Sequence, residues 1–254
     1  MDWPKISIIT PSFNQGKYIR QTIDSVLGQN YPNLEYFIMD GGSTDETIEI
    51  LRSYGDKIRW TSEKDDGQAA AINTGLAKSS GDILAFINSD DYFLPGVLKM
   101  VAEQFSKTGC KWLSGDYKIV NENDREIQTL IILYKKFWRS FSSANVLSVL
   151  NYIIQPSTFW TRELWSQTGG LDVSLRYAFD YDLWMRAMDI QPPLILRQPL
   201  SAFRIHKSSK GGTGYQTQFD EELRVIKRYR SAQAIIRLHQ FHNELIKLTY
   251  KMIK

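Results

Sequence analysis

Two adjacent carboxylates, Asp90 and Asp91, follow a run of five apolar residues at 83–87 and a polar link, Asn88 and Ser89. An unbroken apolar run of this length predicts a strand that is buried on both faces. In open α/β sheets, ligands bind beyond the carboxyl ends of such strands. Carboxylates are ligands that Mg²⁺ and Mn²⁺ prefer, and such a cation neutralises a diphosphate. The stretch therefore predicts a site for a metal and a phosphorylated substrate.

Polar residues also end the other predicted strands. Taken alone, Ser89 or Asp91 could simply cap a helix that begins near Pro95. The carboxyl ends of parallel strands, however, lie along one edge of a sheet, so polar groups that follow several strands meet there. Such groups follow three earlier strands: Ser12 and Asn14, then Asp40, then Asp65 and Asp66. Four polar strand ends on one edge predict a pocket.

The strands that carry these groups alternate with helices through residues 5–116. Short connections between them predict a parallel sheet with helices on both faces. No glycine-rich dinucleotide or triphosphate motif occurs, so a diphosphate bound at this edge would need cations. We expect strands at 5–10, 34–39, 57–61, 83–87 and 111–114, and helices at 15–29, 43–55, 68–78 and from Pro95 onward.

The alternation stops after residue 116. Residues 117–133 predict a hairpin that turns at 121–124, and 134–150 has no clear assignment. A strand near 158–160, a helix at 162–168 and a strand pair broken at Pro199 are expected next. Residues 218–254 read as one or two basic amphipathic helices. They could pack on the domain, on a second subunit or on anionic lipid.

A second stretch that could do chemistry contains Asp180 and Asp182, at the start of a helix predicted from Leu183, Ala187 and Ile190. The helix dipole and free backbone amides favour a carboxylate there, so one of the two could be only a cap. Asp180 is the better catalytic candidate, because Asp182 is better placed inside the first turn.

His206 precedes basic and hydroxyl residues in a loop that ends in glycine. Such a loop could ligate a metal and neutralise phosphate, or it could be a solvated surface loop.

The whole chain has ordinary globular composition. The 254 residues carry a net charge of +3, too small to predict nucleic-acid binding. The one cysteine, Cys110, cannot form an internal disulfide, which favours a reducing compartment. Neither a signal peptide nor a run of roughly 18 apolar residues is visible. We therefore expect a cytoplasmic protein, with peripheral contact at the inner face of a membrane as an option.

Six motifs, in this order, resemble those of glycosyltransferase family 2, in particular a branch of bacterial surface-polysaccharide enzymes. The resemblance runs from about Lys5 to Gly212 and leaves the tail from Gln218 uncovered. The motifs are TPSFNQ at 10–15, MDGGSTDET at 39–47, SEKDDGQAAAINTGL at 62–76, NSDDYFLPGVL at 88–98, GGLDVSLRYAFDYDLWMRA at 169–187 and FRIHKSSKGG at 203–212.

This resemblance implies a GT-A fold, in which a Rossmann-like, mostly parallel sheet has helices on both faces. The expected domain covers 1–215, with a nucleotide-sugar half at 1–116 and an acceptor half at 117–215, and a helical extension follows at 216–254. The implied reaction is an inverting, metal-dependent transfer of a sugar from a nucleotide diphosphate to a hydroxyl of a glycan or lipid-linked acceptor. A homodimer or membrane contact through the C-terminal helices is a further option.

The resemblance also assigns residues. Asp180 is implied to be the catalytic base, and Mn²⁺ or Mg²⁺ is implied at Asp90, Asp91 and His206. The implied nucleotide-sugar contacts are Pro11, Ser12, Asn14, Asp40, Asp65, Gln68, Asn73, Ser89 and Asp90.

Two departures from the family pattern stand out. Asn88 replaces the first Asp of the usual DxD motif, and Phe179 replaces the Glu that usually precedes the catalytic Asp. Two other classes stay open. A nucleotidyltransferase also combines such a sheet with acidic metal ligands, but residues 11–17 are a poor match to its triphosphate loop. A non-catalytic nucleotide-sugar-binding module is the other.

Overall fold

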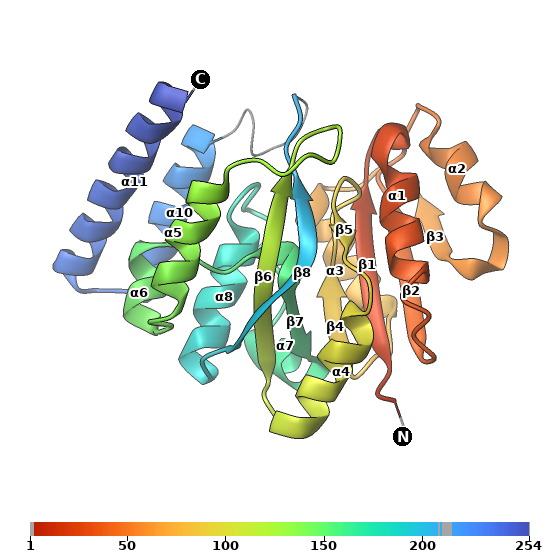
Figure 1. Cartoon of the computed structure of the whole chain (residues 1–254), viewed down its shortest axis with the longest axis horizontal. Coiled ribbons are helices and arrows are strands. Elements are labelled where there is room, and N and C mark those ends of the chain that lie inside the picture. Colours follow the sequence, from red (N-terminus) through yellow and green to blue (C-terminus); the bar gives the residue numbers. More distant parts are fainter. Residues whose placement is uncertain (1–2, 208, 210–214, 254) are drawn as a thin grey trace.

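The computed structural model describes residues 3–207, 209 and 215–253 of the chain. Its centre is a sheet whose eight strands follow the order β3-β2-β1-β4-β7-β6-β8-β5, with helices on both faces (Figure 1). The α/β fold class predicted from the sequence is confirmed. The strands are β1 (Ile6–Ser12), β2 (Leu34–Asp40), β3 (Arg59–Ser62), β4 (Ile83–Phe86), β5 (Tyr92–Phe93), β6 (Trp112–Val120), β7 (Thr158–Thr161) and β8 (Leu194–Arg204).

One half of the sheet is parallel, as the sequence predicts. β1 pairs in parallel with β2 and β4, and β2 pairs in parallel with β3. The connecting helices are α1 (Gly16–Leu27), α2 (Thr47–Ser53), the 3₁₀ turn η1 (Gly55–Lys57) and α3 (Gln68–Lys78). A Cβ atom on Gly75 would lie 2.6 Å from Cγ2 of Ile9, so glycine permits the close approach of α3 to β1.

Strand β4 shows why this half of the sheet is buried on both faces. Successive side chains of a strand point to opposite faces. Leu84 and Phe86 enter one apolar cluster with α3, whereas Ile83 and Ala85 enter another with α1. The polar residues after Ile87 therefore begin where the strand leaves two cores. The carboxylates at 90 and 91 are held by the end of a rigid element.

The other half of the sheet is mixed. β7 is antiparallel to both β4 and β6, β6 is parallel to β8, and β5 is antiparallel to β8. Four elements flank these strands: α4 (Val97–Thr108), the 3₁₀ turn η2 (Gln155–Ser157), α7 (Arg162–Thr168) and α8 (Phe179–Ile190). The face that α8 covers is rich in tryptophan, with Trp112 and Trp184 stacked at 5.6 Å between ring centroids.

Two sequence predictions in this half are wrong. The expected hairpin at 117–133 is reduced to one bridge, between Val120 and Glu126, and helix α5 (Thr129–Arg139) follows. Gln128 has φ +56°, which breaks the extended backbone just before that helix. The expected strand pair around Pro199 is the single strand β8, in which register shifts opposite Asp116 accommodate the proline.

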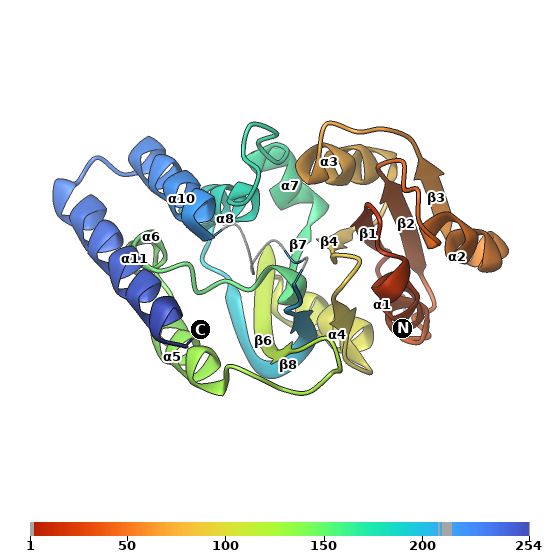
Figure 2. The same cartoon turned by 90° about the horizontal axis from the view of Figure 1, so that it is seen from above.

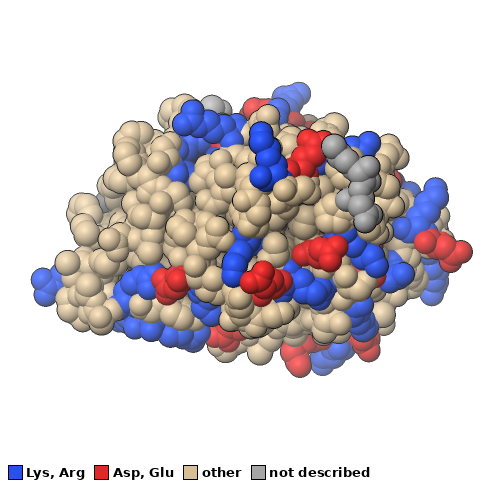
Figure 3. All heavy atoms as spheres, turned by 90° about the horizontal axis from the view of Figure 1, so that it is seen from below, with Lys and Arg blue, Asp and Glu red and all other residues tan. Residues whose placement is uncertain are grey.

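The C-terminal part folds onto the same body. α10 (Tyr215–Tyr229) and α11 (Gln233–Ile253) lie beside α5, α6 (Ala144–Val149) and α8, at the end of the molecule opposite β3 (Figure 2). Val225, Ile226 and Ile236 belong to the same apolar cluster as Trp184. None of the described helices is both long and apolar enough to cross a membrane. Acidic and basic side chains are interspersed on the face in Figure 3.

Candidate active site

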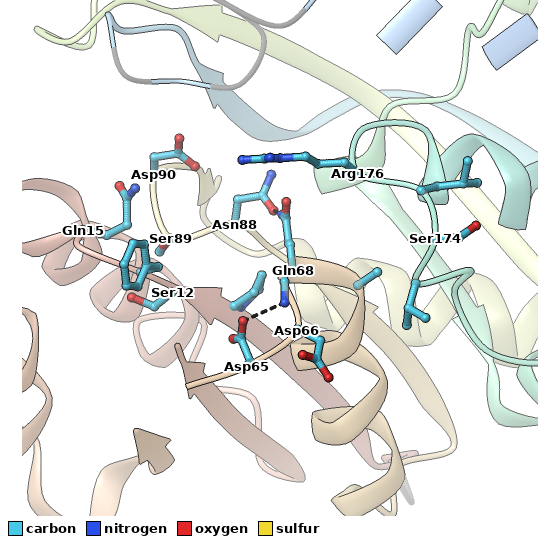
Figure 4. Close-up of a pocket in the computed structure, with 16 residues that line it drawn as sticks. Ser12, Gln15, Asp65, Asp66, Gln68, Asn88, Ser89, Asp90, Ser174 and Arg176 are labelled. Atoms are coloured by element: carbon cyan, nitrogen blue, oxygen red, sulfur yellow. Dashed lines mark hydrogen bonds between the residues drawn. The ribbon is translucent and has the colours of Figure 1, made fainter. Parts of the chain in front are cut away.

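A pocket of about 600 Å³ lies at the carboxyl edge of the parallel strands. Residues of β1, of the turn after β4, of the loop between β3 and α3, and of the loop at 173–176 line it (Figure 4). The polar residues that follow the parallel strands were predicted to meet at this edge. Six of the predicted donor-binding residues line the pocket: Pro11, Ser12, Asp65, Gln68, Ser89 and Asp90. Their role as nucleotide-sugar contacts stays a prediction.

Three other predicted contacts do not line this pocket. Asp40 is 2% exposed, and its carboxylate accepts a hydrogen bond from Oγ of Ser62, which ties the end of β2 to the end of β3. Asn73 bonds both the carbonyl and the amide of Leu171, each at 2.9 Å. Asn14 accepts a hydrogen bond from a backbone amide in the loop after β2. These contacts give the three residues a role in holding the walls of the pocket.

Asp90 and His206 come together from distant parts of the chain. Nε2 of His206 lies 3.1 Å from Oδ2 of Asp90, and the side chains are 5% and 19% exposed. The His206 ring packs against Tyr18, with 4.6 Å between the ring centroids. Nε of Arg204 donates to the backbone carbonyl of Asp90 at 2.9 Å. The end of β8 therefore fixes the turn that carries Asp90.

Asp91 has a different environment from Asp90, and its role as a metal ligand stays a prediction. It is 1% exposed, and its carboxylate accepts hydrogen bonds from the backbone amide of Arg204 at 2.8 Å and from Nδ2 of Asn88 at 3.2 Å. Burial and the charge of Asp90 raise the pKa of the Asp91 carboxyl well above its usual range. The carboxylate joins the turn to β8 and does not line the pocket.

The donor set at this point suits a metal ion that is shared with a diphosphate. Within the described residues, no three carboxylate, histidine or cysteine side chains gather closely enough to hold an ion by themselves. Asp90 and His206 supply one oxygen and one nitrogen ligand. Mg²⁺ and related ions commonly use only one or two protein ligands and take the rest from substrate phosphates and water. The two residues therefore fit such an ion.

Asn88, which stands where family members often have an aspartate, is a junction between pocket residues. Its Oδ1 accepts a hydrogen bond from Nε2 of Gln68 at 2.6 Å. Its Nδ2 lies 3.3 Å from Oε1 of Gln155, and Gln155 in turn donates to the carbonyl of Phe86 at the end of β4. An amide can donate and accept at once, whereas a carboxylate can only accept. The asparagine thus links α3 to β4.

A second cavity of about 550 Å³ adjoins the first, because Gln68, Asn88 and Arg176 line both. Asp180, at the second position of α8, lines this second cavity. Asp182 is 1% exposed and paired with Arg186 and Arg228, at 2.7 and 3.0 Å. Of the two carboxylates considered from the sequence, only Asp180 faces a cavity. Its role as catalytic base stays a prediction.

Three charged residues of these cavities, and one that bonds the turn with Asp90, were not singled out from the sequence. Arg176 extends across the first pocket towards Asn88 (Figure 4), and Arg204 donates to the backbone carbonyl of Asp90. Both lie inside the motifs at 169–187 and 203–212, so those motifs could have indicated them. Lys135 and Glu222 line the second cavity from α5 and α10. They lie in segments without a motif, and only the tertiary fold brings them here.

The comparison with protein families gives one result that covers most of the chain. The model of glycosyl transferase family 2 matches residues 7–163. Curated relatives include an uncharacterized glycosyltransferase, RP339, of Rickettsia prowazekii (strain Madrid E), which is 28% identical over 83% of this chain and 67% of its own. Chondroitin synthase of Escherichia coli is 29% identical over 74% of this chain but only 27% of its own length. The chain thus spans about two thirds of the one and about a quarter of the other.

Solved structures share the fold at low identity. S. aureus TarS 1-349 in complex with UDP is 21% identical, with a TM-score of 0.67 over 92% of this chain and 69% of TarS 1-349. The mannosyltransferase PcManGT from Pyrobaculum calidifontis, in complex with GDP-Man and Mn²⁺, is 16% identical, with a TM-score of 0.71 over 94% of this chain and 70% of its own.

Proposed function

The chain belongs to glycosyl transferase family 2, and on this premise we propose that it moves a sugar from a nucleotide diphosphate to a hydroxyl of an acceptor, with inversion. One observation carries the proposal. The pocket at the sheet edge adjoins the cavity that contains Asp180, and Gln68, Asn88 and Arg176 line both. A donor in the first space and an acceptor in the second would meet at this junction.

The first pocket suits a nucleotide sugar. Pro11, Ser12 and Asp65 lie at the ends of β1 and β3, where the nucleoside would bind. Ser89, Asp90 and Arg176 line the same pocket and would contact the diphosphate and sugar, with the sugar towards Arg176, which also lines the second cavity. The complexes of S. aureus TarS with UDP-GlcNAc and of PcManGT with GDP-Man support this class of donor.

Asp90 and His206 would hold Mn²⁺ or Mg²⁺, with the diphosphate supplying further oxygens. The bound cation would supply positive charge beside the departing diphosphate. The complex of PcManGT with GDP-Man and Mn²⁺ supports a divalent ion in this fold. Arg176 would place a guanidinium at the same end of the pocket.

Asp180 would act as the general base. It would accept the proton of the acceptor hydroxyl while that oxygen forms a bond to the anomeric carbon. The bond from that carbon to the diphosphate would break on the opposite side, and its electron pair would leave with the diphosphate. One base and no covalent intermediate give inversion.

A screen of nucleotide sugars tests the proposal. We expect UDP-GlcNAc, GDP-mannose or a related donor to raise the melting temperature in the presence of Mn²⁺, and to be hydrolysed slowly to the nucleoside diphosphate and free sugar. If the protein instead releases pyrophosphate in a parallel assay with a nucleoside triphosphate and a sugar 1-phosphate, a nucleotidyltransferase would be favoured. Binding without either hydrolysis or transfer would favour a non-catalytic module. A protein that binds none of the donors would contradict all three.

A further inference from the structure

The cavity that contains Asp180 is lined by charged groups and by walls in which apolar side chains predominate over polar ones such as Gln128, Asn151 and Asn243. Asp180, Lys135 and Glu222 come from α8, α5 and α10. All three residues line this one cavity. The apolar walls come from β6, β8, α5, α11 and the segment before η2, with Ile119, Phe203, Ile131, Leu245 and Ile153 as examples.

Glu222 is a carboxyl buried in this cavity. It is 5% exposed, and its Oε1 accepts a hydrogen bond of 2.9 Å from Nε2 of Gln218, one turn earlier on α10. Burial, together with the charge of Asp180, raises the pKa of Glu222 to about 7, and the charge of Lys135 opposes this rise. A carboxyl whose pKa burial raises in this way costs stability at neutral pH even with one hydrogen bond. Such a cost suggests a use beyond folding.

The neighbouring residue fixes where Glu222 points. Glu221 is 3% exposed, and its carboxylate accepts hydrogen bonds from the backbone amides of Arg176, Tyr177 and Ala178, at 3.0, 2.7 and 2.9 Å. These amides immediately precede the first turn of α8, which carries Asp180. Helix α10 is therefore clamped to the start of α8, and this clamp holds Glu222 at the end of the cavity where Asp180 lies.

The apolar walls continue to the surface. Leu130 and Leu245 line the cavity and are 81% and 51% exposed. Exposed apolar side chains continue from them along α5 and α11. These are Leu133, Phe137 and Trp138 on α5, and Leu238 and Phe241 on α11. An apolar group that filled the cavity could leave it along this surface.

We propose that the cavity binds an acceptor in which sugar hydroxyls adjoin an apolar group, and that Glu222 accepts a hydrogen bond from one of those hydroxyls beside Asp180. The apolar group then lies along the walls and leaves between Leu130 and Leu245. This inference rests on the proposed function, which requires an acceptor site next to the donor pocket. The inference adds the chemical class of the acceptor. It also adds Glu222 as a binding residue, on helix α10, which lies outside the segment that matches the family model.

Binding of simple glycosides tests this without any knowledge of the natural acceptor. The probes are n-octyl and methyl β-glycosides of glucose, galactose and N-acetylglucosamine, below the micellar range, titrated into the full chain by calorimetry. We expect at least one octyl glycoside to bind roughly tenfold or more tightly than its methyl counterpart, because burial of the alkyl chain is favourable. Equal affinity of each octyl and methyl pair would overturn the inference.

Two pairs of variants locate the two ends of the ligand. Leu130→Asp should remove most of the octyl preference, whereas Ile190→Asp, the same change on an exposed aliphatic residue of α8 outside both the cavity lining and this apolar surface, should keep it. At pH 8, where Glu222 is ionised, Glu222→Gln preserves the shape of the side chain and should weaken binding of the octyl glycoside roughly tenfold, as loss of a charge-assisted hydrogen bond does. Asp220→Asn, an exposed acid on the same helix, should change nothing.

The outcomes separate this inference from the proposed function. If Leu130→Asp and Ile190→Asp behave alike, or if Glu222→Gln binds as the wild type does, this assignment of the cavity is wrong while donor binding is untouched. If the wild type binds octyl glycosides as expected but no nucleotide sugar, the proposed function fails instead.

Discussion

Acidic residues that are next to each other or one residue apart take different roles at three places in this chain. In each of the pairs Asp90–Asp91, Asp180–Asp182 and Glu221–Glu222, one member is almost fully buried and bonded to an arginine or to backbone amides. The bonded members are Asp91, Asp182 and Glu221, at 1%, 1% and 3% exposure. The other member of each pair lines a cavity. Residue type and spacing alone cannot separate the two roles.

Asp180→Asn tests the catalytic member of one pair. The amide keeps the size of the side chain but cannot take a proton, so transfer should fall by roughly 10²–10⁴. The donor pocket is not lined by Asp180, so the Kd of the donor should stay within about twofold. Single-turnover rates and calorimetry measure the two quantities.

Asp182→Asn is the contrast to that change. It removes the charge that pairs with Arg186 and Arg228, so it should lower the free energy of unfolding. Near-normal turnover by Asp180→Asn would remove Asp180 from the role of base.

Glu222 makes stability depend on pH. Its pKa rises from an ordinary value of 4.5 to about 7 on folding, so between these pH values the folded protein keeps a proton that the unfolded chain has released. The free energy of unfolding therefore falls as pH rises through this window, by roughly 3 kcal/mol from this group. In the Glu222→Gln variant this contribution to the free energy of unfolding does not change with pH.

Urea unfolding at pH 4.5, 6 and 8 measures the difference between wild type and Glu222→Gln. The advantage of the variant should grow up to about pH 7 and then level off. Buried His239, with a pKa of about 4, acts with the opposite sign, but it is present in both proteins and cancels in the difference. A difference that does not vary with pH would show that Glu222 titrates normally.

At the scale of elements, Glu221 acts as a cap that another helix supplies to α8. Ala178, at the N-cap position, has no side-chain cap of its own, and Glu221 of α10 receives the amides of 176–178 instead. Glu221→Ala leaves these amides without their acceptor and should cost about 3 kcal/mol of unfolding free energy. Because the start of α8 carries Asp180, transfer should also slow by at least roughly tenfold.

Urea unfolding and steady-state kinetics of the same preparation give both effects of Glu221→Ala. Asp220→Asn, which changes an exposed acid next to it, should stay within about 0.5 kcal/mol of the wild type. Lower stability with unchanged kcat would mean that the cap supports the fold but does not position Asp180.

The elements that sequence could predict are those that local pattern determines. Continuous apolar runs such as 83–87 and the Ala-rich helix at 68–78 appear almost as expected, as β4 and α3. The hairpin prediction for 117–133 was wrong because apolar residues such as Leu130 and Ile132 fit a strand as well as a helix. β8 was expected to break at Pro199 because the bulge that tolerates this residue depends on its neighbour β6.

At the scale of the whole molecule, the C-terminal helices complete the body of the protein. The division after residue 215 that the sequence suggested stays a prediction, but Val225, Ile226 and Ile236 share an apolar cluster with Trp160 and Trp184. Each such aliphatic side chain contributes about 1.5–3 kcal/mol when buried. Removal of residues 215–254 should therefore abolish cooperative unfolding of the remainder, as followed by near-UV circular dichroism. A truncated chain that unfolds as the full chain does would show an independent extension.

The sequence predicted one part of the candidate site and not the other. Polar residues after parallel strands must meet at one edge, so the pocket with Asp65 and Asp90 followed from topology. The contribution of α10 could not be predicted, because its approach to α8 depends on packing between segments that are about forty residues apart. Charge and amphipathic pattern showed only that 216–254 is helical and needs a partner surface.

The central claim is that Asp90 anchors a divalent cation and, with it, the diphosphate of a sugar donor. Calorimetric titration of UDP and of GDP, each with and without Mn²⁺, into wild type, Asp90→Ala and the exposed control Asp56→Ala tests it most directly. We predict that one nucleotide binds the wild type and the control at least tenfold more tightly with Mn²⁺ than without, and that Asp90→Ala loses this gain. The same Mn²⁺-dependent gain in Asp90→Ala would contradict the account.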